Sequence, residues 1–278
     1  MATMRTHRRV DLSGQQQEMT GSQARLLIQE GQWHAPTAGL APGYVQANLA
    51  IVERTLAEDF ERFCQLNPQP LPLLERLPNG SPHTVSCAED ADLRTDVPKY
   101  WIYEGGVMKR EVQNLLDLWQ DDWCTFLLGC SFTFDALLVE AGIPVRHLEQ
   151  HSNVSMYETT LPLQPSGAFQ GKLVVSMRPI PADDLARAVQ LTKPLSLAHG
   201  EPVHMGDPDA LGIRDLAQPD YGDPVEINDG DIPVFWACGV TTQAVARRCK
   251  IPFMITHAPG HLLITDLTIT SCCVDSRE

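Results

Sequence analysis

The sequence predicts a mixed fold of α-helices and β-strands, of the α+β or α/β class. Helical and strand periodicities alternate along the 278 residues. The last folded stretch has the pattern strand, helix, strand, turn and strand, which is typical of an α/β unit. With 43% hydrophobic and 20% charged residues, the chain is large enough for one extended domain or two lobes.

The N-terminal part contains two predicted helices. Residues 1–21 are polar and without periodicity, so we expect a mobile arm there. Ser22 is predicted to cap the first helix, and Gly31 to supply its left-handed end. Thr55 and Glu58 are spaced as a capping box, which predicts the start of the second helix.

The middle of the chain opens with a proline-rich irregular segment, residues 67–99. A loop of this length in a compact protein is often functional. The pattern then predicts strands around 101–112 and 173–177. Between these strands it predicts helices around 114–128 and 133–141.

Two further helices follow. The segment 181–192 places proline at the first helical position and two acids near the positive end of the helix dipole. The apolar run 233–239 predicts a strand, and 241–249 a capped helix. Strands are predicted on both sides of the tight turn at Pro259 and Gly260.

Two segments match at a constant offset of 108 positions. Aligning residues 130–144 with residues 238–252 pairs Cys130 with Cys238, and also pairs the Ile-Pro dipeptides that end each segment. Both segments read strand, Cys/Gly turn, helix, Ile-Pro and strand. An internal duplication explains the match, with chance identity over a short window as the alternative. A duplication predicts that the two turns face each other.

Charge and cysteine content exclude several classes of protein. A net charge of -14 disfavours nucleic-acid partners, which require a basic surface. No apolar run reaches the roughly 18 residues that a membrane crossing needs, and no signal peptide is recognisable. The eight cysteines form no CxxC pair, which predicts free thiols and a cytoplasmic location. Motifs for nicotinamide, ATP and the hydrolase nucleophile elbow are missing from the sequence.

The two Cys/Gly turns are candidate substrate-binding sites. Each places backbone N–H groups and hydroxyls at a helix start, where the dipole favours anions. A substrate carboxylate is therefore predicted to bind there, with helix capping as the alternative. The candidate residues are Cys130, Ser131, Cys238, Gly239 and Thr241.

The densest polar cluster contains His257, His261 and Asp266. Either histidine can act as general acid or base near neutral pH, or bind a metal together with the aspartate. The alternative is one exposed and one hydrogen-bonded histidine. His204 and Asp207 lie in another loop, either solvated or completing a metal site with His257 and His261.

Three further polar residues are candidates for substrate binding. Arg94 carries a planar guanidinium that suits a carboxylate, with a salt bridge to Asp92 or Asp96 as the alternative. Tyr44 and Arg178 are polar residues within otherwise apolar segments.

Several strings together resemble one known family. Its members are described as hydro-lyases in bacteria and as D-glutamate cyclase in mitochondria, and the similarity covers about residues 22–267. The strings are TAGLAPGYVQANL, ADLRTD, GCSFTFDALLVEAGIPVRH, LVVSMRPI, HGEPVHMGDP, PVFWACGVTTQAVA and THAPGHLLITD.

This resemblance implies a protein of two lobes. Residues 22–112 and 193–267 are expected to form a larger three-layer αβα lobe. Residues 113–192 are expected to form a smaller, inserted two-layer αβ lobe, and residues 268–278 a C-terminal tail.

The implied activity is that of a hydro-lyase (EC 4.2.1.-), which removes water from a small amino or hydroxy acid. In this family the reaction converts D-glutamate to 5-oxo-D-proline. Glu158 stands where a basic residue is expected, which would weaken binding of a dicarboxylate. For the mechanism we hypothesise that His257 or His261 is base and acid, and that Arg94 grips a carboxylate.

Two other functions stay open at this level. One is a non-catalytic protein that binds a small carboxylate, and the other is a metal-dependent hydrolase. The expected partner is a small-molecule carboxylate, without nucleic acid or membrane, and a homo-oligomer is open. No cofactor is indicated with certainty, and a divalent metal such as manganese or magnesium is an option.

Overall fold

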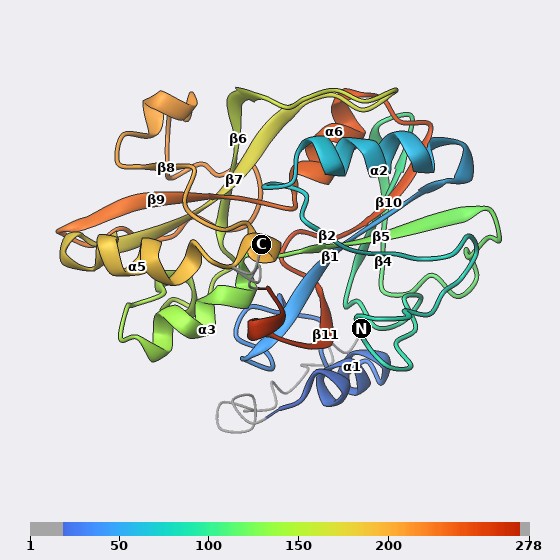
Figure 1. Ribbon diagram of the computed structural model, residues 1–278, viewed down its shortest axis with the longest axis horizontal. Helices are drawn as coiled ribbons and strands as arrows, with labels where there is room; N and C mark the ends of the chain where they lie inside the picture. The colour runs from blue at the N-terminus through green and yellow to red at the C-terminus, as the bar shows by residue number, and fades with distance from the viewer. Residues whose placement is uncertain (1–18, 273–278) are drawn as a thin grey trace, which may run out of the picture.

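The computed structural model describes residues 19–272 as two antiparallel sheets surrounded by helices (Figure 1). This arrangement confirms the predicted mixture of α and β structure. The elements in chain order are α1 (Gly21–Gln29), β1 (Tyr44–Glu53), η2 (Arg54–Leu56), α2 (Ala57–Leu66), β2 (Leu73–Arg76), β3 (Tyr100–Glu104), β4 (Val107–Val112), β5 (Trp123–Gly129), α3 (Phe132–Glu140), α4 (Arg146–Glu149), β6 (Ser155–Pro162), β7 (Lys172–Pro181), η3 (Ala182–Asp184), α5 (Leu185–Thr192), η4 (Ser196–Ala198), β8 (His204–Met205), η5 (Pro208–Leu211), β9 (Asp231–Ala237), α6 (Thr241–Arg248), β10 (Phe253–His257), β11 (Leu263–Thr268) and η6 (Ile269–Cys272).

The larger sheet has seven strands in the order β2-β5-β1-β10-β3-β4, with β11 also paired to β1. Strand β1 is central, and its inner eight residues are all buried. One face of this sheet packs against α2 and α6 through a core that includes Phe60, Phe126 and Val245. The other face is covered by Leu77, Leu93 and their neighbours, so the irregular segment 67–99 forms part of a structural layer.

The smaller sheet has the strand order β6-β7-β9-β8. In Figure 1 it lies to the left of the larger sheet, with α3 and α5 below it. Phe134 of α3 and Ala188 of α5 pack against this sheet at Trp236. The opposite face is covered by the chain around Leu211 and Ile213.

The expected boundaries of the two lobes do not coincide with the sheets. Strand β5 falls within the predicted insertion 113–192, yet it pairs with β1 in the larger sheet. Strand β9 falls within the segment 193–267 but pairs with β7 in the smaller sheet. The chain leaves the larger sheet through the β5–α3 turn, and it returns from the smaller sheet through the β9–α6 turn.

Several local predictions are confirmed, and some are wrong. The helix predicted around 114–128 is wrong, because its apolar end forms the buried strand β5. Strands of this kind show no alternation, so periodicity cannot separate them from buried helices. The helix predicted for 133–141 is confirmed as α3, and that for 241–249 as α6.

Helix caps differ from the predicted ones. Thr20 rather than Ser22 caps α1, in a capping box with Gln23. The Thr55–Glu58 capping box is not formed, because the short 3-10 helix η2 leads directly into α2. Gly31 does adopt a left-handed φ of 67°, as expected at a helix end.

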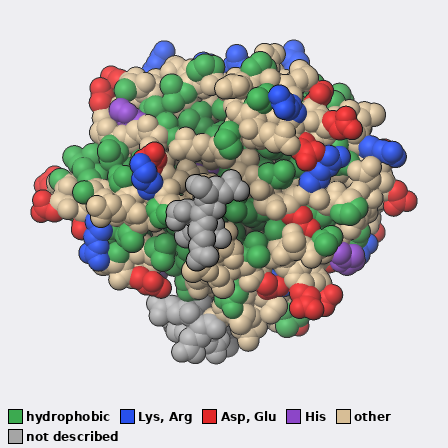
Figure 2. Space-filling model, viewed as in Figure 1, with side chains coloured by type: hydrophobic (Ala, Val, Ile, Leu, Met, Phe, Trp, Pro, Cys, Tyr) green, Lys and Arg blue, Asp and Glu red, His purple; other side chains and the backbone are tan. Residues whose placement is uncertain are grey.

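The predicted N-terminal arm lies almost entirely outside the described residues, and so does most of the predicted tail. Among the elements of residues 19–272, no helix combines the length and the apolar character needed to cross a membrane. Figure 2 shows acidic and basic side chains interspersed around the rim of the viewed face.

Candidate active site

The two Cys/Gly turns meet between the sheets. Cys130 follows β5 and Cys238 follows β9, and both pack in one apolar cluster with Met156 and Leu262. The prediction that the two turns face each other is therefore confirmed. Segments 108 positions apart in the chain thus build one site.

A small cavity of about 10 Å³ lies between these turns, which is room for about one water molecule. Its walls come from both sheets and carry no charged side chain. The lining residues are Asn48, Cys130, Ser131, Phe132, Val154, Met156, Cys238, Val240, His257, Gly260 and Leu262. Because the cavity has room for only about one water molecule, a substrate can enter only when its walls separate.

His257, at the end of β10, brings a titratable group to the cavity. Its Nδ1 lies 3.2 Å from the amide nitrogen and 3.3 Å from the carbonyl oxygen of Leu49. Its Nε2 is buried without a hydrogen-bond partner. Burial lowers the pKa of His257 to about 4, so the imidazole is neutral at pH 7. When the ring proton is on Nδ1, Nε2 can accept a proton, and when the ring proton is on Nε2, that nitrogen can donate it.

Both cysteine side chains in the cavity are protonated thiols at neutral pH. Burial, and to a smaller extent the neighbouring Cys238, raises the pKa of the Cys130 thiol to about 12. Burial likewise raises the pKa of Cys238 to about 11. The backbone N–H of Phe132 donates to the Cys130 sulfur at 3.5 Å.

Asn48 of β1 connects the two turns. Its Nδ2 donates to the carbonyl oxygen of Gly129, next to Cys130, at 2.7 Å. On the other turn, a Cβ atom at position 239 would lie 2.1 Å from the same Nδ2. Gly239 is therefore required for the close approach of the two turns.

Behind the Ser131 wall lies a buried ionic network centred on Arg178. The guanidinium donates to Asp135 at 2.7 Å and 3.2 Å, to Ser131 at 3.1 Å and to Ser176 at 3.0 Å. Burial tends to raise the pKa of Asp135, but the charge of Arg178 and the nearby His147 side chain outweigh it and hold that pKa below its usual value. Arg178 is fully buried and lies outside the cavity lining, so the structure gives it a supporting position.

A second, larger pocket of about 430 Å³ adjoins the cavity. Asn153 and His261 line this outer pocket, while the residues next to them in the chain, Val154 and Leu262, line the cavity. Burial lowers the pKa of His261, whose Nδ1 lies 3.0 Å from the carbonyl oxygen of Pro259. The cavity and the outer pocket thus share one wall.

That shared wall is polar. The Asn153 Nδ2 donates to the Pro259 carbonyl at 3.1 Å, and its Oδ1 is buried without a partner. A Cβ at Gly260 would lie 2.4 Å from this Oδ1. On the outer side, Lys99 lies 3.3 Å from Glu111 and supplies a cation to the pocket.

The predicted trio of His257, His261 and Asp266 is not assembled. His257 lines the cavity and His261 the outer pocket, whereas Asp266 forms a bidentate ion pair with Arg25 at 2.9 Å and 3.0 Å. Arg94 is likewise engaged, with hydrogen bonds of 2.7 Å to 3.2 Å to the Asp92 carboxylate.

Several other predicted residues also lie outside the cavity. Tyr44 packs with Leu40 near α1. His204 is bonded through Nε2 to the backbone oxygen of Asp207 at 2.7 Å, at the edge of the smaller sheet. Within residues 19–272, no group of three or more His, Cys, Asp or Glu side chains is arranged to hold a metal, so the set proposed with His257 and His261 is not brought together.

The hydroxyl groups at the two turns serve mainly the local backbone. Thr241 donates to the Cys238 carbonyl at 2.6 Å and accepts the Val174 N–H at 3.1 Å. Ser131 accepts from Arg178. Thr241 therefore bonds the backbone of its own turn and of β7, and its hydroxyl does not cap α6, which has no side-chain cap.

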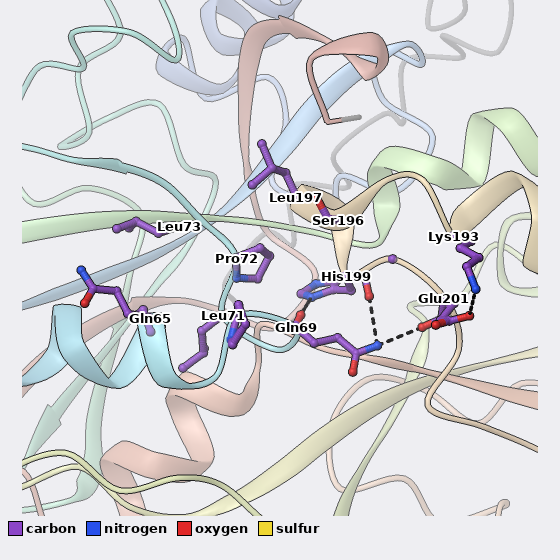
Figure 3. A pocket seen from close by; sticks show the side chains of 13 residues that line it. Gln65, Gln69, Leu71, Pro72, Leu73, Lys193, Ser196, Leu197, His199 and Glu201 are labelled. Atoms are coloured by element: carbon purple, nitrogen blue, oxygen red, sulfur yellow. Dashed lines mark hydrogen bonds and ion pairs between the residues drawn. The ribbon is translucent and has the colours of Figure 1, made fainter. Parts of the chain in front are cut away.

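A larger cavity, of about 510 Å³, lies elsewhere, between the end of α2 and η4 (Figure 3). Lys193 pairs there with Glu201 at 3.0 Å, and Gln69 donates to the His199 and Glu201 carbonyls, whereas Nε2 of His199 is buried without a partner. The remaining walls are mostly leucine and proline. We place the candidate site at the smaller cavity because the unpartnered His257 nitrogen and the two thiols converge there.

Sequence reasoning missed Asn48, Asn153 and Lys99. Asn48 could have been noticed as an amide within the apolar strand VQANLAIV. The other two carry no local signal, since only the fold brings them to the outer pocket. Glu158 accepts a hydrogen bond from Tyr221 at 2.9 Å and does not line the cavity or the outer pocket.

Known proteins are similar to this chain over most of its length. Residues 124–266 match the sequence model of the family described as D-glutamate cyclase. A protein of Thermoanaerobacter sp. named "Putative hydro-lyase" is 55% identical over 246 residues, 88% of this chain and 93% of its own length. Relatives with the same name in Bacillus licheniformis and Bacillus subtilis are 52% and 51% identical, covering 90% and 92% of this chain and 95% and 100% of their own.

One solved structure, a nitrogen repressor-like protein of Methanococcus jannaschii, covers 88% of this chain and 97% of its own at 11% identity and a TM-score of 0.37. The sequence relatives place this mixed α and β protein in the class of hydro-lyase-like proteins. Within that class, the chain belongs to the D-glutamate cyclase family.

Proposed function

We propose that this protein is a hydro-lyase that removes water from a small amino or hydroxy acid at the cavity between the two Cys/Gly turns. The carrying observation is the fully buried Nε2 of His257, which has no partner and lines a cavity shared with two thiols. An unpaired buried polar group is costly, and such groups persist at functional sites.

The proposed substrate is D-glutamate and the proposed product 5-oxo-D-proline. The family match and the names of the relatives support water loss. In the outer pocket Lys99 supplies a cation, which lies among the carboxylates of Glu111, Asp220 and Asp223. One carboxylate would be held in the outer pocket by Lys99 and His261. The reacting end would enter the inner cavity once the wall at Asn153 and Gly260 opens.

The reaction needs two kinds of assistance, namely proton transfers and the stabilisation of a developing negative charge. The α-amine loses a proton and attacks the γ-carboxyl carbon, forming the C–N bond. The oxyanion that develops must be stabilised, and the C–O bond then breaks as hydroxide leaves with a proton as water. A neutral His257, able to accept or donate at Nε2, suits the proton steps.

We also propose a cytoplasmic location for the protein. The observation that supports it is that Cys64, Cys87, Cys124, Cys130 and Cys238 are free thiols.

The experiment is to incubate the purified chain with D-glutamate, L-glutamate and small hydroxy acids, with manganese, with magnesium and with a chelator. Loss of 18 mass units by mass spectrometry, about the mass of one water, identifies the substrate. We expect turnover of D-glutamate, and a drop of about 100-fold or more in kcat for His257→Gln. Full turnover by a folded His257→Gln variant would exclude His257 from the proton steps.

The main alternative is a protein that binds a small carboxylate without converting it. The small, uncharged cavity favours this alternative over a metal-dependent hydrolase. Calorimetry that detects tight D-glutamate binding, together with no product after hours, would establish the binding function instead.

A further inference from the structure

Two thiols line the cavity, and the reaction as described gives them no task. Cys130 and Cys238 occupy equivalent positions of the two matched segments. Each sulfur accepts a backbone N–H from two residues further on, Phe132 in one turn and Val240 in the other. The same local arrangement is thus presented twice to one cavity.

We propose that Cys130 and Cys238 form an acid–base pair, in which one thiolate accepts a proton from the substrate and the other thiol protonates the leaving oxygen. This inference rests on the proposed function and divides its proton steps: the two thiols exchange protons with the substrate, and His257 exchanges a proton with the pair.

The proximity of the two sulfurs divides the two tasks between them. A charge on Cys238 raises the pKa of Cys130, so the pair resists a second ionisation once the first thiolate has formed. The singly ionised pair therefore contains one base and one acid. The two backbone N–H groups at the helix starts favour the thiolate form.

The uncharged walls of the cavity make the pair depend on its substrate. Without a ligand, burial keeps both thiols protonated. The ammonium group of an amino acid would bring in a positive charge and lower the pKa of the nearer thiol. This favours an α-amino acid over a hydroxy acid as the substrate, because only the amino acid carries such a charge.

The proton balance of the proposed step closes without an oxidant or a cofactor. The first thiol gives its proton to Nε2 of His257, which leaves one thiolate in the pair. This thiolate takes one N–H proton from the ammonium group, the nitrogen bonds to the γ-carboxyl carbon, and the second thiol protonates the departing oxygen. The second sulfur then takes the other N–H proton, the first thiol protonates the same oxygen, and the C–O bond breaks as water leaves, so that both sulfurs return to their starting states.

The alternative is a purely structural role, in which both cysteines are small buried residues that fill the core. Cys249 provides a matched control, since it lies at the end of α6, outside the cavity, and its sulfur interacts with Gln170. Replacing a thiol by a hydroxyl changes the shape little but raises the pKa of the group far above that of cysteine.

The test compares the Cys130→Ser, Cys238→Ser and Cys249→Ser variants of the full chain, with D-glutamate as the substrate. We expect each cavity variant to lose about 10² to 10⁴ in kcat, and the double variant to be little worse than either single one. Cys249→Ser should retain wild-type turnover. The pH profile of kcat/KM should lose a limb in each cavity variant, which a packing defect would not cause.

A folded Cys130→Ser or Cys238→Ser variant with more than about a tenth of wild-type kcat would overturn the pair, since a general acid or base contributes at least 10². Thermal unfolding checks the fold, and Cys→Ala variants replace any serine variant that fails to fold.

A wild-type chain that converts neither D-glutamate nor any other acid would refute the proposed function, and the pair would then be judged separately. In that case the Cβ chemical shift of ¹³C-labelled cysteine is followed in an alkaline titration. Coupled thiols predict that Cys238→Ser lowers the midpoint of Cys130, and an unchanged midpoint would refute the pair itself.

Discussion

Asn48 fills the space that a Cβ atom at position 239 would need, since its Nδ2 lies 2.1 Å from that point. The same nitrogen donates to Gly129 at 2.7 Å, so one amide on β1 sets the distance between the two Cys/Gly turns. The identity of residue 239 and the shape of the cavity are therefore coupled through a side chain from a third segment.

Gly239→Ala should destabilise the protein by about 1–3 kcal/mol, the usual cost of overpacking, and should lower turnover. The backbone at Gly239 is not in the left-handed region, so the expected cost is steric. Adding Asn48→Ala should recover part of the stability, because it removes the clashing atoms. Strict additivity of the two changes in urea unfolding would contradict this coupling.

Removing one partner of the Arg178–Asp135 pair should cost about 3–5 kcal/mol, since it leaves a buried charge without its partner. Arg178→Met and Asp135→Asn test this in denaturant unfolding. The matched control is Arg94→Met, which breaks the partly exposed pair with Asp92 and should cost about 1 kcal/mol or less. Similar losses for both arginines would argue against a special role of burial.

Stability should fall as the pH falls from about 6.5 towards 4, because His257 and His199 stay neutral in the folded protein. Their folded pKa values lie below the unfolded value, so the unfolded chain binds more protons in this window. Stability is complete above the unfolded pKa, and each histidine contributes a slope of about 1.4 kcal/mol per pH unit.

His257→Gln and His199→Asn should each remove one such slope in unfolding measured across this window. Asparagine suits the left-handed φ of 76° at position 199. Only the His257 variant should also lose turnover, because His199 lines the cavity of Figure 3 instead. Loss of activity in both variants would indicate that the larger cavity also takes part in the reaction.

Lys99→Met should raise KM for a carboxylate substrate about tenfold or more, since a hydrogen bond to a charged group contributes about 1.5–3 kcal/mol. Its effect on kcat should be small, because Lys99 lines the outer pocket and not the cavity. Steady-state kinetics on D-glutamate measure both constants. A variant that lowers kcat at unchanged KM would place the cation at the reacting centre.

The mixed α and β class, most of the helices and strands after residue 129, and the family could all be predicted from the amino-acid sequence alone. These features depend on local periodicity and on strings that are contiguous in the chain. The internal match even indicated that Cys130 and Cys238 belong together, since equivalent turns of a duplicated unit tend to meet.

Which polar residues share the site could not be predicted, because it depends on how distant segments pack in three dimensions. His257, His261 and Asp266 are close in sequence, but β10 and β11 direct them to a cavity, an outer pocket and an ion pair with Arg25. Asn48 joins the site because β1 is central in the larger sheet. The residues that line the site are brought together by pairing between strands that are far apart in the chain. Neighbouring residues of one strand, in contrast, point to opposite faces of the sheet.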